Sequence, residues 1–167
     1  SDLIQAEEYD ERGREASNQP RIEGDHLAFV DSGTWVRYAN FYFPGTPTQI
    51  SVSAAIQGGP IESPTTATQR VYLYLVAPGA SYSRTTAMKV AEIAVTGSSW
   101  YTYQTVSTTN VSKVPEGAYD IILDFSGGIN VDSFSIDEIK IVEPATVTGL
   151  EISVRPNKVV YQPGEAL

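Results

Sequence analysis

Turn-forming residues interrupt this sequence so often that it leaves little room for a long helix. Glycine or proline recurs roughly every ten residues, and serine, threonine, valine and tyrosine abound between these interruptions. Val71, Leu73 and Leu75 share one face of a predicted strand, whereas Tyr72 and Tyr74 lie on the other. No window shows a convincing apolar period of 3.6 residues. The pattern predicts an all-β chain with no helix longer than about two turns.

Strands are predicted wherever alternating or apolar segments lie between two turn signals. The expected strands are Leu3–Tyr9, Leu27–Val30, Trp35–Phe43, Gln49–Ala55, Arg70–Val76, Lys89–Val95, Trp100–Val106, Ala118–Phe125 and Ser133–Val142. A phase slip at Asp137-Glu138 predicts a bulge in the last of them. Many short antiparallel strands of this kind indicate a β-sandwich of the jelly-roll type.

The composition of the chain changes after Val142. Glu143-Pro144-Ala145-Thr146 is typical of a linker, and residues 147–165 resemble the opening strands of a bacterial immunoglobulin-like domain. About 20 residues are too few to close such a sandwich. We therefore expect a jelly-roll module at residues 1–143, then a linker and the truncated start of an immunoglobulin-like domain at residues 144–167. This organisation predicts a multi-modular parent protein.

Charge and composition exclude several classes of function. A net charge of −9 disfavours nucleic acid, anionic membranes and strongly anionic glycans, but leaves neutral sugars open. Cysteine is absent, which excludes a thiol nucleophile and a disulfide scaffold and suits an exported bacterial protein. The single histidine, His26, excludes a multi-histidine metal site within the chain, and a solvated turn residue is its favoured interpretation. There is no apolar run near the ~18–20 residues that would cross a bilayer.

Five short segments, in this order, resemble carbohydrate-binding module family 6 and the related family 35. They are Ile4–Tyr9, Phe29–Phe43, Thr96–Val106, Pro115–Tyr119 and Asn130–Phe134. The chain departs from the family pattern in an enlarged loop at Gly58–Gln69, in Thr34 and in Ser133. The resemblance implies a glycan-binding jelly roll with a structural calcium and a ligand site among the loops at one edge. It also implies a non-catalytic module that targets a larger extracellular polysaccharide-processing protein, with its own catalytic domain, to a polysaccharide or oligosaccharide.

A sugar site is expected at this edge. Trp100 follows a Gly-Ser-Ser turn, and an exposed indole can stack on a pyranose; Asn130 has an amide that both donates and accepts. The resemblance implies that both residues belong to the site, with Phe29 as the second stacking wall and Glu15 at the rim. Trp35 is the replacement wall, although a core position is favoured for it. A core or edge-strand role for Trp100 and a turn-capping role for Asn130 are the alternatives.

A calcium site is expected beside the first strand. Gln5 and Glu7 lie two residues apart, so they share a face, and a carboxylate from the last strand would complete an oxygen cage. Asp137 is the expected third ligand and Asp132 the reserve choice. A solvated acidic face is the alternative, and the family resemblance favours calcium.

Other functions remain open at this stage. A small glycan-degrading hydrolase or lyase is one alternative, although no recognisable catalytic segment is present, and a structural or adhesive domain with a protein partner is another. A second sugar platform on a sheet face is an alternative for several tyrosines, but cross-strand pairing is the favoured interpretation for Tyr72, Tyr74, Tyr82, Tyr101 and Tyr103. The resemblance favours a secreted or cell-surface location in a bacterium.

Overall fold

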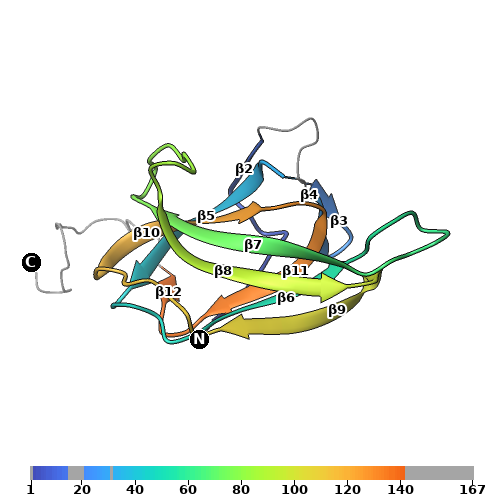
Figure 1. The fold of residues 1–167 in the computed structure, drawn as a ribbon. Helices are drawn as coiled ribbons and strands as arrows, with labels where there is room; N and C mark the ends of the chain where they lie inside the picture. The colour runs from blue at the N-terminus through green and yellow to red at the C-terminus, as the bar shows by residue number, and fades with distance from the viewer. Residues whose placement is uncertain (1, 15–20, 31, 142–167) are drawn as a thin grey trace, which may run out of the picture.

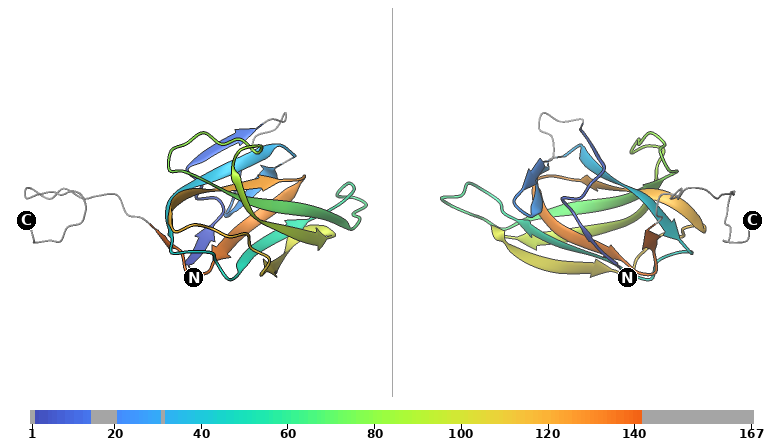
Figure 2. Two further views of the ribbon diagram at one scale, coloured as in Figure 1. Left: turned by 60° about the vertical axis from the view of Figure 1, so that its left-hand side comes forward. Right: turned by 180° about the vertical axis from the view of Figure 1, so that it is seen from behind.

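The protein is a sandwich of two antiparallel sheets. The computed structural model describes residues 2–14, 21–30 and 32–141, and these contain strands, turns and bends but no helix. Figure 1 and the turned views of Figure 2 show the two sheets stacked face to face. The predicted all-β jelly-roll class is confirmed, and the described residues contain no helix that could cross a membrane.

Each sheet has six strands within the described residues. Sheet A has the order β3-β4-β11-β6-β9, and β1 also pairs with β11. Its strands are β1 (Asp2–Gln5), β3 (Arg21–Glu23), β4 (His26–Val30), β6 (Ile50–Ile56), β9 (Ser99–Thr108) and β11 (Ile129–Ile136). Sheet B has the order β12-β5-β10-β7-β8, and β2 also pairs with β5. Its strands are β2 (Glu11–Arg14), β5 (Thr34–Phe43), β7 (Ala67–Val76), β8 (Met88–Gly97), β10 (Gly117–Phe125) and β12 (Lys140–Ile141).

The core lies between the two sheets because one face of β5, β6, β7, β8, β10 and β11 is apolar. Leu73 and Leu75 from β7 and Leu123 from β10 are almost completely buried, as their alternation predicts. Tyr38 of sheet B and Phe134 of sheet A meet edge to face, with ring centroids 4.9 Å apart. The phenol of Tyr38 donates a hydrogen bond to the carbonyl of Ala6, so this buried polar group is satisfied.

The strands differ from the expected ones chiefly at the two ends of the module. The first strand ends at Gln5, and not at Tyr9, because the chain turns at Ala6 and Glu7. The segments β2 and β3 were not expected as strands. The last expected strand is divided into β11 and β12 by a turn in which Glu138 has a φ of 66°, so the phase slip at Asp137-Glu138 marks a turn and not a bulge. The predicted linker and immunoglobulin-like start at residues 144–167 lie outside the described residues.

Candidate functional site

Several connections gather at one edge of the sandwich. The β8–β9 and β10–β11 turns lie there, and the enlarged β6–β7 connection projects next to the point where β8 ends and β9 begins (Figure 1). Gly127 packs so tightly against Gln69 that an added Cβ would lie 2.5 Å from the Gln69 Oε1. Gly58 and Thr65 form an isolated bridge inside the β6–β7 connection. These contacts give the edge a defined surface.

Trp100 lies at this edge, at the start of β9. Its half-buried indole packs on Gly128, where an added Cβ would lie 3.3 Å from the Cη2 of Trp100. The main-chain N–H of Trp100 donates to the Gln57 Oε1 at 3.4 Å. The pairing of β6 with β9 is irregular here, because its register shifts between Ala54 and Ile56. The ring therefore belongs to the loop edge and not to the core between the sheets.

Asn130 is brought to Trp100 by the pairing of sheet A. It lies opposite Ala55 of β6, and its Nδ2 donates a hydrogen bond of 3.2 Å to the main-chain oxygen of Trp100. An asparagine amide has two N–H donors and one acceptor oxygen. This bond uses one donor, so the other N–H and the Oδ1 have no partner among the contacts of the described residues. The structure thus joins the two sequence-predicted residues in one site.

The structure does not describe the side chains of two other residues that were predicted to contact the sugar. Phe29 lies on β4, which pairs with β11 through Val30 and Ile129, but its side chain lies outside what the structure describes. Glu15 lies outside the described residues.

Trp35 lies neither beside Trp100 nor in the core between the sheets. It is half-buried on the outer face of sheet B, where its ring lies against Gly13 of β2, and an added Cβ on that glycine would be 2.2 Å from the Trp35 Cζ2. Its ring centroid is 5.2 Å from that of Tyr82. Alternation along β5 explains the placement, because Val36 takes the inward position. Neither the core position favoured for Trp35 nor its use as a replacement wall agrees with this placement.

The predicted calcium ligands are divided between two ends of a strand pair. Gln5 lies opposite Ser133, and the N–H of Ala6 donates to the main-chain oxygen of Asp132, so Asp132 lies at the turn that carries Glu7. Asp2 lies opposite Ile136 at the other end of β1. Asp137 is therefore beyond that end, roughly 13 Å along the strand from Gln5. The register favours Asp132, the reserve choice, and separates Asp137 from the other two residues.

Glu7 has one feature that fits a cation. Its Oε2 is buried and has no hydrogen-bond partner among the described residues, although a buried carboxylate oxygen is costly to leave unpaired. Within the described ranges, no group of three histidine, aspartate or glutamate side chains is arranged to hold a metal ion. A cation here would thus depend on two carboxylates, the amide oxygen of Gln5 and main-chain oxygens, which are ligands that calcium accepts.

Two aromatic residues near Asp132 were not predicted as site residues. The rings of Tyr103 and His26 meet at 6.0 Å on the outer side of sheet A. Burial, followed by the charges of Asp132 and Asp25, raises the pKa of the Tyr103 phenol to about 12. The phenol oxygen is buried and has no partner within the described part of the chain. Sequence alternation along β9 places Tyr103 on a sheet face, but nothing in the sequence links it to His26.

Gln57 was also missed by the sequence analysis. It follows β6 directly, and its Oε1 accepts from the N–H of Trp100 while its Nε2 is buried without a partner in the described residues. The only available signal is its position before Gly58-Gly59, because a polar residue between a buried strand and a turn lies at a sheet edge.

The protein is thus a two-sheet β-sandwich in which an indole and an asparagine amide lie side by side at a loop edge. Residues 5–143 match the carbohydrate binding module (family 6), which covers most of the chain. The chain belongs to this family. The predicted family is thereby confirmed, as is the prediction that the module binds carbohydrate and is not itself an enzyme.

Two curated relatives are both endo-1,4-beta-xylanase A of Thermoclostridium stercorarium. Each is 32% identical over 139 residues, which is 79% of this chain. The match covers 23% of one relative and 18% of the other, so the chain spans about a fifth of their length.

Solved structures of family 6 modules are similar in sequence and fold. A module studied for its binding sub-sites by crystallography and calorimetry is 28% identical, with a TM-score of 0.58, and the match covers 81% of this chain and 92% of that one. A module of Clostridium stercorarium in complex with cellobiose is 27% identical, with a TM-score of 0.59 and the same coverage. A module of Clostridium cellulolyticum in complex with xylose shares the fold at 22% identity, with a TM-score of 0.60, over 82% of this chain and 97% of that one.

Proposed function

We propose that this module binds neutral, β-1,4-linked pyranose chains of the xylan or cellulose type at the loop edge. The observation that carries the proposal is the pairing of Trp100 with Asn130, in which a half-buried indole rests on Gly128 and the asparagine amide fixes its main chain. The sugar class is supported by the similarity to two xylanases and to a module in complex with cellobiose.

The chemistry of the two residues suits a neutral sugar. A flat indole can cover the C–H face of a pyranose, which no charged side chain does as well. The Oδ1 and second N–H of Asn130 can accept from one sugar hydroxyl and donate to its neighbour. The net charge of −9 opposes polyanionic glycans. We include Phe29 as the second stacking wall and Glu15 as a rim residue of the same site.

We further propose a structural calcium ion held by Gln5, Glu7 and Asp132. The buried Oε2 of Glu7, which has no partner in the described part of the chain, supports this assignment, as does the main-chain bond that holds Asp132 beside the turn after β1. The ion would link that turn to β11 and would stabilise the folded state by mass action. It would take no part in sugar contact.

The module acts within a larger protein in this proposal. The relatives are several times longer than the match, which supports a parent chain with a catalytic domain of its own. The module would then hold that domain close to a polysaccharide, and its modest affinity would be raised by multivalency. We propose a secreted or cell-surface location in a bacterium, in keeping with the bacterial relatives.

Affinity electrophoresis of the isolated chain tests the proposal. Native gels containing soluble xylan or hydroxyethyl cellulose should retard the module, whereas polygalacturonate should not, because that polymer is anionic. Reducing ends should stay constant during incubation with each polymer, since their release would instead favour a hydrolase or lyase. The same mobility on every gel would contradict sugar binding and favour an adhesive domain. The Trp100→Ala variant is the matched control, which should run without retardation.

A further inference from the structure

The segment between β7 and β8 packs on the outer face of sheet B, over side chains of β5, β7 and β10. We call residues 77–87 the strap. Ala80, Tyr82 and Ala87 of the strap pack against a small cluster of buried side chains on that face, formed by Tyr74, Val76 and Ile122. This cluster is separate from the core between the two sheets.

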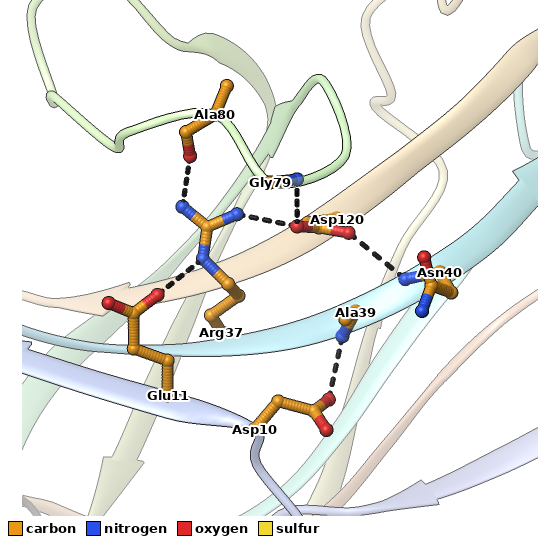
Figure 3. Close-up of polar contacts among 8 residues, drawn as sticks. All are labelled: Asp10, Glu11, Arg37, Ala39, Asn40, Gly79, Ala80 and Asp120. Atoms are coloured by element: carbon orange, nitrogen blue, oxygen red, sulfur yellow. Dashed lines mark hydrogen bonds and ion pairs between the residues drawn. The ribbon is translucent and has the colours of Figure 1, made fainter.

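A first set of polar contacts fixes the start of the strap (Figure 3). Asp120 of β10 is 2% exposed, and it accepts hydrogen bonds from the main-chain N–H of Gly79 at 2.9 Å and from the Arg37 Nη1 at 2.6 Å. Arg37 also donates to the main-chain oxygen of Ala80 and pairs with Glu11 of β2. The main chain of the strap therefore supplies a hydrogen-bond partner to each member of the buried Arg37–Asp120 ion pair.

A second set of contacts fixes the end of the strap. Asp124, also on β10, is fully buried, and it accepts from the Tyr82 phenol at 2.5 Å and from the Arg84 Nε at 3.0 Å. Arg84 forms a second, parallel bond to the same carboxylate. Burial and this carboxylate raise the pKa of the Tyr82 phenol. Lifting the strap would break these bonds to Asp124 and expose the apolar cluster beneath it, so the strap is a fixed cover and not a mobile lid.

The strap lies over the aromatic side chains that this face would otherwise offer to a sugar. Tyr82 meets Trp35 at 5.2 Å and Tyr74 at 5.5 Å, both edge to face. Stacking on a pyranose needs a flat ring with one face open. At Trp35 and Tyr74 the space in front of the sheet is taken by Tyr82 of the same chain.

We propose that the strap closes the outer face of sheet B to ligands and so confines sugar binding to the loop edge. The evidence that the face is closed is the set of contacts described above, whereas the consequence for sugar binding rests on the proposed function. The proposal predicts that each module binds one glycan chain, and it assigns opposite roles to the two tryptophans. Trp100 faces the ligand, and Trp35 belongs to the closed face.

The two tryptophans of the chain make the proposal measurable. The full chain is labelled with 5-fluorotryptophan, and the two ¹⁹F resonances are assigned with Trp35→Phe and Trp100→Phe. Titration with xylohexaose and with cellohexaose should shift the Trp100 resonance and leave the Trp35 resonance in place. A shift of the Trp35 resonance of similar size would overturn the proposal. If neither resonance moves with either sugar, the proposed function fails, and the closed face is judged by the experiment below, which needs no sugar.

A soluble paramagnetic relaxation agent tests the strap itself. The agent should broaden the Trp35 resonance weakly in the parent and more strongly in Arg84→Ala, which removes the two guanidinium bonds to Asp124. If that variant does not fold, the double variant Arg84→Ala, Asp124→Asn removes the unpaired charge together with its partner and should show the same increase. Strong broadening of Trp35 already in the parent, with no further increase in a folded strap variant, would overturn the closed face.

Discussion

The Nδ2 of Asn130 and the main-chain oxygen of Trp100 are joined by a hydrogen bond of 3.2 Å. The two residues lie on β11 and β9, which do not pair with each other, because β6 lies between them. Asn130 is opposite Ala55 on that intervening strand, and this small side chain is completely buried. The bond therefore spans β6 and links the residue that we propose orients a sugar to the residue that we propose stacks on it.

Replacing Trp100 by alanine should weaken sugar binding without unfolding the module. The loss should be about 1–3 kcal/mol, because the indole supplies most of the stacking area. Isothermal titration calorimetry with xylohexaose measures the loss, and circular dichroism checks the fold. Tyr101→Ala is the matched control, because Tyr101 is the next residue on the same strand and is 78% exposed. Equal affinities of the parent and Trp100→Ala would place the site elsewhere.

Substitutions of Asn130 should separate its two hydrogen-bonding roles. Asn130→Ala removes the amide and should cost about 0.5–1.5 kcal/mol of binding, since water partly replaces its partners. Asn130→Asp should cost more, because a carboxylate oxygen would face the main-chain oxygen of Trp100 where a donor stood before. Calorimetry on both variants shows which substitution costs more binding free energy. An aspartate variant that binds better than the alanine variant would contradict this role of the Nδ2 donor.

Much of the fold could be predicted because alternation reports which face of a strand is buried. Val71, Leu73 and Leu75 point inward as expected. The short strands β2 and β3 were missed because Glu11–Arg14 carries three charged residues and a glycine and shows no apolar alternation. Their pairing depends on β5 and β4, which is tertiary information.

The candidate site could be predicted only in part, for reasons of register. The turns before Trp100 and Asn130 are visible in the sequence, so both residues were found. The sequence does not tell which end of β1 lies beside Asp132 and which beside Asp137, because this depends on the offset between two strands distant in sequence. Asp120 and Asp124 did leave a signal, since both lie on the polar face of an otherwise apolar strand, but their partners in the strap could not be inferred from it.

The Arg37–Asp120 pair should contribute far more to stability than an exposed ion pair of the same sheet. Both side chains are nearly buried, so Asp120→Asn leaves the guanidinium with only the exposed carboxylate of Glu11 as a charged partner and should cost about 3–5 kcal/mol of unfolding free energy. The control is Glu92→Gln, because Glu92 pairs with Lys89 and Arg70 at an exposed position. That change should stay within about 0.5 kcal/mol. Urea denaturation followed by fluorescence measures both, and similar losses would contradict the distinction.

Removal of calcium should lower the thermal stability of the module through Glu7 and Asp132 and not through Asp137. An ion at about 100 times its Kd stabilises the folded state by about 2.7 kcal/mol, so adding a chelator should lower the Tm of the parent measurably. Glu7→Gln and Asp132→Asn should each abolish the difference in Tm between calcium and chelator. Asp137→Asn should retain it, because that residue lies at the opposite end of β1 and holds Thr48 by a 3.2 Å hydrogen bond instead. Differential scanning calorimetry of the four proteins, with and without chelator, decides the matter. A parent with the same Tm in both conditions would rule out the ion. A calcium response lost in Glu7→Gln and Asp137→Asn but kept in Asp132→Asn would restore the ligand set first expected from the sequence.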